Sequence, residues 1–295
     1  MSEFKTFHPI VNFAFFLAVI GFSMVFMHPV CLAVSIVTAV CWQIMMKGMR
    51  AVRFGIFGIL PILIISALIN PAFNHEGKTI LCYLPSGNPL TAESIIYGLS
   101  AAVMLASVIE WFASFNEIIT SDKLMYLFGK IIPSLSLVLS MTLRFVPRFK
   151  ERIKDFSAAQ KAIGRGAFEK GIINRAKGGL KILSAVVTDS MESAIETADS
   201  MHCRGYGLPG RSAFSNYRLD KRDAFALIWI VLTATYVIVG SISGGMHFRY
   251  FPSIKYAEPG IYQISIFAAY LGLCFMPVFI EIREAFRWKM LKSKI

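Results

Sequence analysis

The sequence predicts an all-α fold: a polytopic helical membrane protein with about six spans and long amphipathic helices in a cytoplasmic insertion. Of its 295 residues, 56% are hydrophobic, the mean hydropathy is +0.60, and 16% are charged, against roughly 25% in soluble domains. Apolar runs long enough to cross a bilayer recur along the chain. The alternating pattern of a membrane β-barrel is not present in the sequence.

The first apolar run, residues 10–46, is too long for one crossing, because it would extend about 55 Å through a roughly 30 Å hydrocarbon core. His28-Pro29 lies in the middle of this run and is expected to break it into two spans. A third span is expected to end at Asn70-Pro71, before a polar loop. The third to sixth spans are expected at residues 54–69, 93–115, 224–242 and 261–280.

The net charge of +12 is concentrated: the segment from Arg144 to Arg222 holds 16 of the 30 lysines and arginines and 8 acidic residues. In a membrane protein such a segment marks the cytoplasmic side, so we do not interpret it as a nucleic-acid interface. Both termini are then cytoplasmic, and Leu124–Val146 does not cross the membrane once: it lies in the inner interface, or it enters the membrane and returns on the same side. An external N-terminus would place the basic loop 47–53 on the wrong side.

These assignments divide the chain into membrane spans at 1–123, an interfacial and cytoplasmic region at 124–222, and spans with a basic tail at 223–295. The first span lacks the basic start and cleavage site of a signal peptide and is expected to be retained. The five cysteines form no CxxC pair, so the sequence indicates neither a metal framework nor a disulfide framework.

The insertion is expected to contain two amphipathic helices. The first runs from Arg148 to about Ile163 and stops at Gly164-Arg165-Gly166, because glycine commonly follows the last turn of a helix. The second begins near Asn174, is interrupted by Gly178-Gly179, and stops at Cys203-Arg204-Gly205. Its apolar residues form a narrow stripe with three- and four-residue spacing, which is typical of helix packing. The stripe comprises Leu180, Leu183, Val187, Met191, Ala194, Ala198 and Met201.

Both predicted helices therefore end in a small residue, an arginine and a glycine. A basic residue beside a glycine is an ordinary helix terminus, because it complements the helix dipole. Two matching ends in one insertion suit a partner with two similar sites, since a guanidinium is a fork of donors for carboxylates and carbonyls.

With these motifs the chain resembles the transmembrane component of energy-coupling factor transporters, ATP-binding cassette importers of vitamins and transition metals. The resemblance rests on "FHPIVNF", "LPILIISALINP", "TLRFVPRFKERIKDFSAAQKAIGRG" and "AIETADSMHCRGYGLPGRSAF". It implies that Gly164-Arg165-Gly166 and Cys203-Arg204-Gly205 end two coupling helices and dock into grooves on two ATPase subunits. The family more often has alanine before the arginine, so Gly164 and Cys203 are departures that keep a small residue.

The resemblance further implies a scaffold in a prokaryotic cell membrane, with a substrate-binding membrane subunit as a third partner. Mg-ATP would be bound by the ATPases, and this chain would carry no cofactor and no catalytic residues. A stand-alone secondary transporter or channel is the alternative. The spans of such proteins usually contain buried ionisable residues, whereas the candidate spans here are nearly free of them, with Glu93 and Glu110 expected near the ends of the fourth. A membrane enzyme is a third hypothesis, but the chain has no HExxH, GxSxG or Walker motif. The sequence does not indicate the substrate.

Overall fold

The computed structural model describes residues 3–83, 89–129, 133–164 (backbone alone at 133–136), 172–208, 217–256 and 260–292. The chain forms two compact units. Met1–Leu124 and Tyr217–Ile295 make up one, which we call the membrane unit, and Met125–Asn216 make up the other, which we call the insertion unit. Helices dominate both units, so the predicted all-α membrane fold is confirmed.

In the described part of the membrane unit, five helical segments are long and apolar enough to span a bilayer, and a sixth, α1, is shorter. Met49–Phe73 is one continuous segment built from α3 (Met49–Phe54), a π-helical turn η2 (Gly55–Ile59) and α4 (Leu60–Phe73). The other helices of this unit are a 3-10 turn η1 (Glu3–Thr6), α1 (Pro9–Val25), α2 (Pro29–Lys47), α5 (Ala92–Ile118), α9 (Lys221–Ile242) and α10 (Ile261–Lys292).

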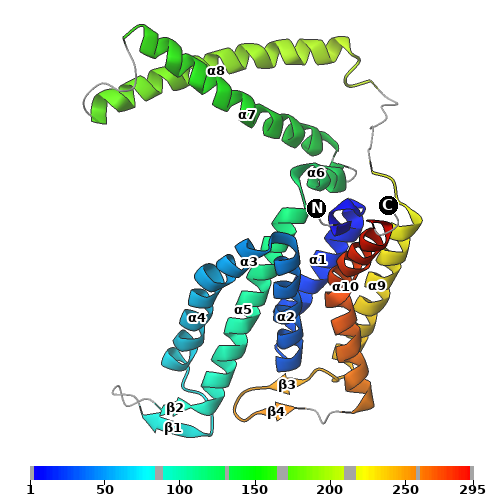
Figure 1. Ribbon diagram of the computed structural model, residues 1–295. Helices are drawn as coiled ribbons and strands as arrows, with labels where there is room; N and C mark the ends of the chain where they lie inside the picture. Colours follow the sequence, from blue (N-terminus) through cyan, green and yellow to red (C-terminus); the bar gives the residue numbers. More distant parts are fainter. Residues whose placement is uncertain are drawn as a thin grey trace. The chain divides into compact units, whose positions relative to one another are not determined.

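Two short antiparallel hairpins connect pairs of these helices. Strands β1 (Ile80–Tyr83) and β2 (Pro89–Thr91) lie between α4 and α5, and β3 (Phe248–Arg249) and β4 (Lys255–Tyr256) lie between α9 and α10. Both hairpins are at the end of the membrane unit opposite the two termini (Figure 1). The two termini therefore share one side of this unit, which agrees with an even number of spans.

The first two spans begin in the same way. His8 and His28 are the residues before Pro9 and Pro29, and each imidazole Nδ1 accepts a hydrogen bond of 3.2 Å from the backbone N–H two residues later. Proline is favoured at the first helical position because its missing N–H would have no partner there. The predicted break at His28-Pro29 is confirmed, since α1 ends at Val25 and α2 starts at Pro29.

Helices of the membrane unit extend beyond the predicted spans at three places. The third span was predicted from Phe54, but its helix starts at Met49 and includes the basic residues Arg50 and Arg53. The helix also continues past Asn70, since Pro71 lies within the last turn of α4. The basic tail is helical too, because α10 continues to Lys292.

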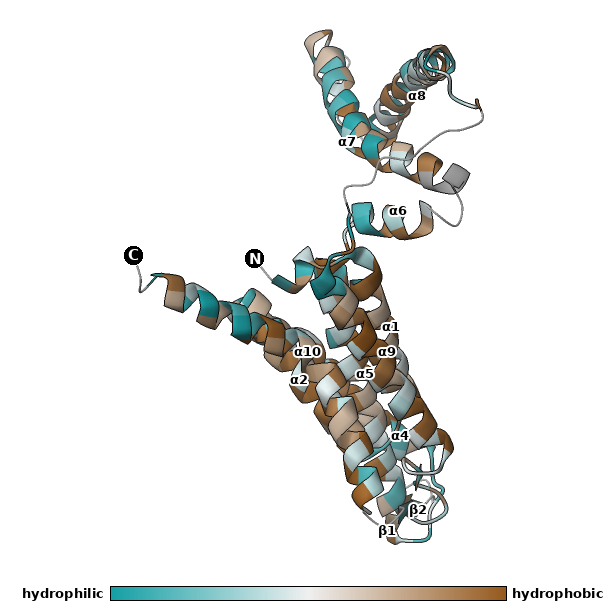
Figure 2. Ribbon diagram, turned by 90° about the vertical axis from the view of Figure 1, so that its right-hand side faces the viewer, coloured by the Kyte–Doolittle hydropathy of each residue, from teal (hydrophilic) through white to brown (hydrophobic). Residues whose placement is uncertain are grey.

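Aromatic side chains form the centre of the membrane unit. Trp42, Trp111, Phe15 and Phe16 are almost completely buried, with ring centroids 5.4–6.2 Å apart in several tilted, edge-on and stacked pairs. A polar group lies among them: the indole N–H of Trp111 donates to the Ser35 hydroxyl at 2.9 Å. Such hydrogen bonds between helices help to hold a bundle together where lipid removes the hydrophobic driving force. Many large apolar side chains of these helices are exposed, and hydrophobic residues are frequent along their length (Figure 2).

The insertion unit contains the rest of α6 (Ser121–Gly129), which starts in the membrane unit, and then α7 (Pro133–Ala162) and α8 (Ile172–Cys203). The first amphipathic helix was expected from Arg148, but α7 begins at Pro133 and carries Pro147 within it. The predicted interruption at Gly178-Gly179 is also wrong, because α8 continues through both glycines. Leu124–Val146 is shared between α6 and α7, and α7 is not among the apolar segments of spanning length.

Candidate functional site

The two long helices of the insertion unit, α7 and α8, contact each other through a small patch. On α8, Ile182 and Val186 are buried, with 7% and 5% of their surface exposed. Close by, the Arg152 guanidinium of α7 forms an ion pair with the Asp189 carboxylate of α8. A cavity of about 170 Å³ beside this pair is lined by Phe145, Arg148, Phe149, Arg152, Asp189, Ser190, Ser193 and Ala194. An apolar contact and an ion pair therefore define this crossing.

The predicted stripe on α8 lies mainly on another face of the helix, with Ala194 at the border of the cavity. Leu180 and Met191 expose 64% and 65% of their surface, Leu183 53% and Val187 43%. Ala194 and Ala198 are also exposed, and Met201 is half-buried. The α8 residues that are buried in the insertion unit, Ile182 and Val186, are not in the stripe. The stripe is thus an apolar surface within this unit, and what packs on it remains a prediction.

Reading the sequence also missed exposed apolar residues of both helices. On α8, Ile195 exposes 65% of its surface and lies next to the stripe in the sequence. On α7, four exposed apolar side chains precede the predicted start of the helix, namely Val138, Leu139, Leu143 and Val146. Phe149 and Ile153, which lie in the part that was predicted, are also exposed, so exposed apolar residues extend over more than four turns. Teal and brown segments alternate along α7 and α8, as expected of amphipathic helices (Figure 2). Helical periodicity continued back to Pro133 would have found the α7 residues.

The end of α8 is a Schellman motif, which satisfies the last carbonyl groups of the helix. Tyr206 N–H donates to the Met201 carbonyl at 3.0 Å, and Gly205 N–H donates to the His202 carbonyl at 3.0 Å. Gly205 has φ +77°, a left-handed conformation that favours glycine. Arg204 therefore occupies the cap position itself. Its side chain is exposed, and the guanidinium makes no hydrogen bond or ion pair to another described residue.

The end of α7 differs from that of α8. Ile163 and Gly164 follow the last helical residue, and Gly164 has φ +76°, with its N–H donating to the Lys161 carbonyl at 3.1 Å. The left-handed glycine thus precedes the arginine of this motif, whereas in the motif at Cys203 it follows the arginine. Arg165 and Gly166, the rest of the predicted motif, lie outside the described residues. The two predicted docking ends of the insertion unit are alike in sequence, but the left-handed glycine that ends the helix stands before the arginine in one and after it in the other.

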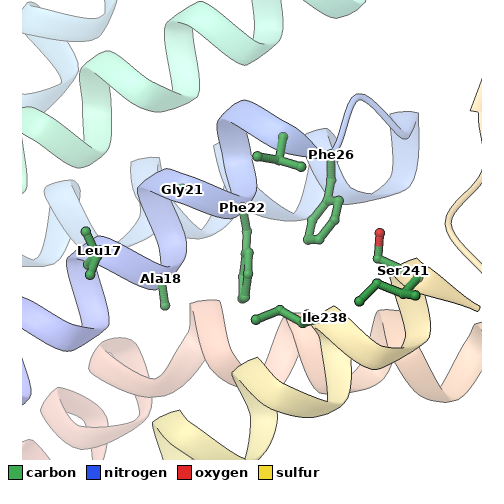
Figure 3. A pocket seen from close by; sticks show the side chains of 9 residues that line it. Leu17, Ala18, Gly21, Phe22, Phe26, Ile238 and Ser241 are labelled. Carbon is green, nitrogen blue, oxygen red and sulfur yellow. The ribbon is translucent and has the colours of Figure 1, made fainter.

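The membrane unit has several cavities. Two of them, of about 500 and 590 Å³, have charged side chains in their linings, whereas a third offers little for a polar ligand. This third cavity, of about 400 Å³, lies between α1 and α9, where Phe22 and Phe26 face Ile238 and Ser241 (Figure 3). Ser241 is the sole polar side chain among the residues that line it. A cavity of this kind can accept an apolar chain of a lipid, and it has no group that would select a hydrophilic substrate.

Two carboxylates are buried in α5. Glu93 lies in the first turn, and its oxygens accept from the Thr79 hydroxyl at 2.9 Å and from the Thr79 N–H. Glu110 was expected near the end of the span, but α5 continues to Ile118, roughly 12 Å further. Glu110 is 3% exposed, and its Oε2 has no hydrogen-bond partner among the described residues. Across the described ranges, no three His, Cys, Asp or Glu side chains come together as they would around a metal ion.

These features define a class: a multi-pass helical membrane protein whose insertion presents two amphipathic helices with arginine-bearing ends. Residues 5–214, more than half of the chain, match the family model described as cobalt transport protein (CbiQ). The chain belongs to this family.

The curated relatives are energy-coupling factor transporter transmembrane proteins (EcfT). The protein of Bacillus selenitireducens is 27% identical over 211 residues, which are 68% of this chain and 75% of the relative. That of Acidaminococcus fermentans is 29% identical over 168 residues, 53% of this chain and 62% of the relative. That of Lactobacillus helveticus is 30% identical over 118 residues, so the match spans 43% of that relative and 40% of this chain. The fold and these relatives indicate a transmembrane scaffold subunit of an energy-coupling factor transporter, and they do not favour a stand-alone transporter.

Proposed function

We propose that this chain couples ATP hydrolysis on two partner ATPase subunits to uptake through a separate substrate-binding membrane subunit. The observation that carries the proposal is the end of α8. The Schellman motif holds Arg204 at the tip of a 32-residue helix, with its guanidinium exposed. A fixed fork of donors on a rigid helix suits a groove lined by carboxylate or carbonyl oxygens.

The second docking end in this proposal is Gly164-Arg165-Gly166. The two ends have different registers at their left-handed glycines, so they fit two related grooves better than one groove used twice. The ATPases would bind Mg-ATP, and this chain would bind no cofactor and catalyse no reaction. The exposed apolar faces of α7 and α8 would receive the substrate-binding subunit, which would select the micronutrient, a vitamin or a transition-metal ion.

The proposed orientation has both termini in the cytoplasm of a prokaryotic cell. Its support is the distribution of charge, because lysines and arginines of cytoplasmic loops are retained on the inner side of the membrane. The insertion and the end of α10 are basic, whereas the hairpin side carries few positive charges.

The test is the recovery of the two ATPases with this chain. Arg204→Ala and Arg165→Ala should each weaken docking by roughly tenfold or more, because a charge-assisted hydrogen bond contributes about 1.5–3 kcal/mol. Arg204→Lys should lose most of the same affinity, since an ammonium group keeps the charge but not the fork. Arg175→Ala is the matched control, because Arg175 is an exposed arginine at the other end of α8. The proposal fails if the double variant at 165 and 204 retains both ATPases and normal uptake.

A further inference from the structure

The N-terminal segment is attached firmly to the membrane unit. Phe4 of η1 is fully buried, with ring centroids 5.3 Å from Phe15 of α1 and 5.5 Å from Trp42 of α2. Phe7 exposes 3% of its surface. This segment lies at the same end of the unit as the end of α5 and the start of α9 (Figure 1). A displacement of η1 would therefore disturb the aromatic core of the spans.

The same segment binds the point where the chain leaves the membrane unit. The first stretch of that unit ends at Leu124, one residue after Lys123 on α6. Lys123 is 5% exposed, and its ammonium group donates to the Lys5 carbonyl at 2.6 Å. With the Asn12 amide oriented to donate to the Phe4 carbonyl at 3.1 Å, its oxygen accepts from Lys123 at 2.6 Å.

The segment also binds the point where the chain returns, which is Tyr217. The His8 N–H donates to one Asp223 oxygen at 3.4 Å, and the other oxygen accepts from Asp220 N–H at 3.3 Å in the capping box of α9. Arg222 donates to the Thr6 hydroxyl at 3.1 Å, and its guanidinium lies 4.2 Å from the centre of the Phe7 ring.

Lys123 and Asp223 act at separate contacts of this segment. The Lys123 ammonium group donates to the Lys5 carbonyl and to the Asn12 amide oxygen, and the Asp223 carboxylate accepts from the His8 and Asp220 N–H groups. The pKa of Lys123 is lowered to about 8, chiefly by burial and also by the positive charge of Lys5, while the negative charge of Asp223 raises it. The N-terminal segment therefore has one buried charged anchor where the chain leaves the membrane unit and another where it returns.

We propose that residues 3–12 form a clasp that holds the exit and the return of the chain at fixed positions on the spans, with Lys123 and Asp223 as its positioning residues. The inference rests on the proposed function. When the ATPases displace the tips of α7 and α8, fixed exit and return points pass the motion to α5 and α9. Loosely held exit and return points would absorb the motion instead. Lys123 and Asp223 therefore set the uptake obtained per ATP and do not determine whether the ATPases bind.

The first experiment measures uptake per ATP hydrolysed in liposomes containing the whole complex. Lys123→Met should reduce this ratio by about tenfold while the ATPases still co-purify, because the Lys5 carbonyl and the Asn12 amide lose their donor. Asp223→Asn weakens the acceptor of the His8 N–H where the chain returns, so it should reduce the ratio in the same direction, and the double variant should lose at least as much as Lys123→Met. Lys47→Met is the matched control, because the Lys47–Glu117 ion pair is part-exposed and includes no residue of the clasp. An unchanged ratio in Lys123→Met, or an equal loss in Lys47→Met, overturns the clasp.

The second experiment uses the full chain without partners, so it remains decisive if the ATPases prove not to bind. Spin labels are placed at Ser121→Cys and Arg218→Cys, both exposed, after the exposed native cysteines have been replaced. They report the distance between the exit point and the return point of the chain. The distance distribution should be narrow and should broaden in Lys123→Met. Arg222→Gln, at a part-exposed position, replaces Lys123→Met if that variant does not fold. Distributions that stay narrow in both variants refute the clasp, and failure of ATPase binding alone refutes only the proposed function.

Discussion

The ion pair between Arg152 and Asp189 offers a direct test of whether the crossing of α7 and α8 matters. Arg152 exposes 41% of its side chain and Asp189 29%, so water screens the pair in part. Exposed pairs contribute about 0.2–1 kcal/mol, and we expect the upper end of this range because both groups border a small cavity. Neutralising either partner should then reduce the ratio of the crossed to the uncrossed arrangement by about fivefold.

The assay is a double-mutant cycle of Arg152→Gln and Asp189→Asn, read from spin labels at the exposed positions Glu151 and Glu192. Each single variant should add a second, longer distance, and the double variant should show a coupling energy near 1 kcal/mol. The effect should weaken at high salt, because salt screens partly exposed charges. Lys154→Gln removes the same charge from an exposed position of α7 and serves as the control.

A coupling energy below about 0.2 kcal/mol would refute this reasoning, because it would show that the apolar contact alone sets the crossing. The same conclusion would follow if Lys154→Gln shifted the distances as much as Arg152→Gln.

Three further predictions concern backbone geometry and charge. Gly205→Ala should weaken ATPase recovery several-fold, because a side chain at its φ of +77° costs about 1 kcal/mol and loosens the helix end that holds Arg204. Gly98→Ala should lower the thermal stability of the purified chain, since a Cβ there would lie 3.0 Å from the Ala67 carbonyl; overpacking costs about 1–3 kcal/mol, and Gly21→Ala, in open space, is the control. The pKa of Lys123 is about 8 in the folded chain and 10.5 in the unfolded chain, so between these pH values the unfolded chain binds more protons than the folded one. Stability should therefore rise from about pH 8 to 10.5, and Lys123→Met should abolish that rise.

The sequence already contained the membrane character and most of the helix ends, because these depend on local chemistry. Hydrophobic length predicts a span wherever it occurs, and the His28-Pro29 break follows from the proline ring and the cap before it. Gly164 and Gly205 end their helices for a reason that is equally local, since both adopt the left-handed conformation. Boundaries inside continuous helices were predicted less well. The third span was predicted to end at Pro71, and the first helix of the insertion was predicted to start after Pro147. Helices continue through both prolines, because neighbouring turns and packing tolerate the lost hydrogen bond.

By itself the sequence determined a helical membrane chain with a basic insertion and two arginine-bearing helix ends, because periodicity and capping act over a few residues. Only the tertiary structure decided which face of α8 is buried, since Ile182 and the exposed Leu183 are equally apolar neighbours. It also brought Lys123, Asp223 and the N-terminal segment together across more than 200 positions of sequence. Contacts over such distances depend on how the spans pack, which no local pattern of residues encodes.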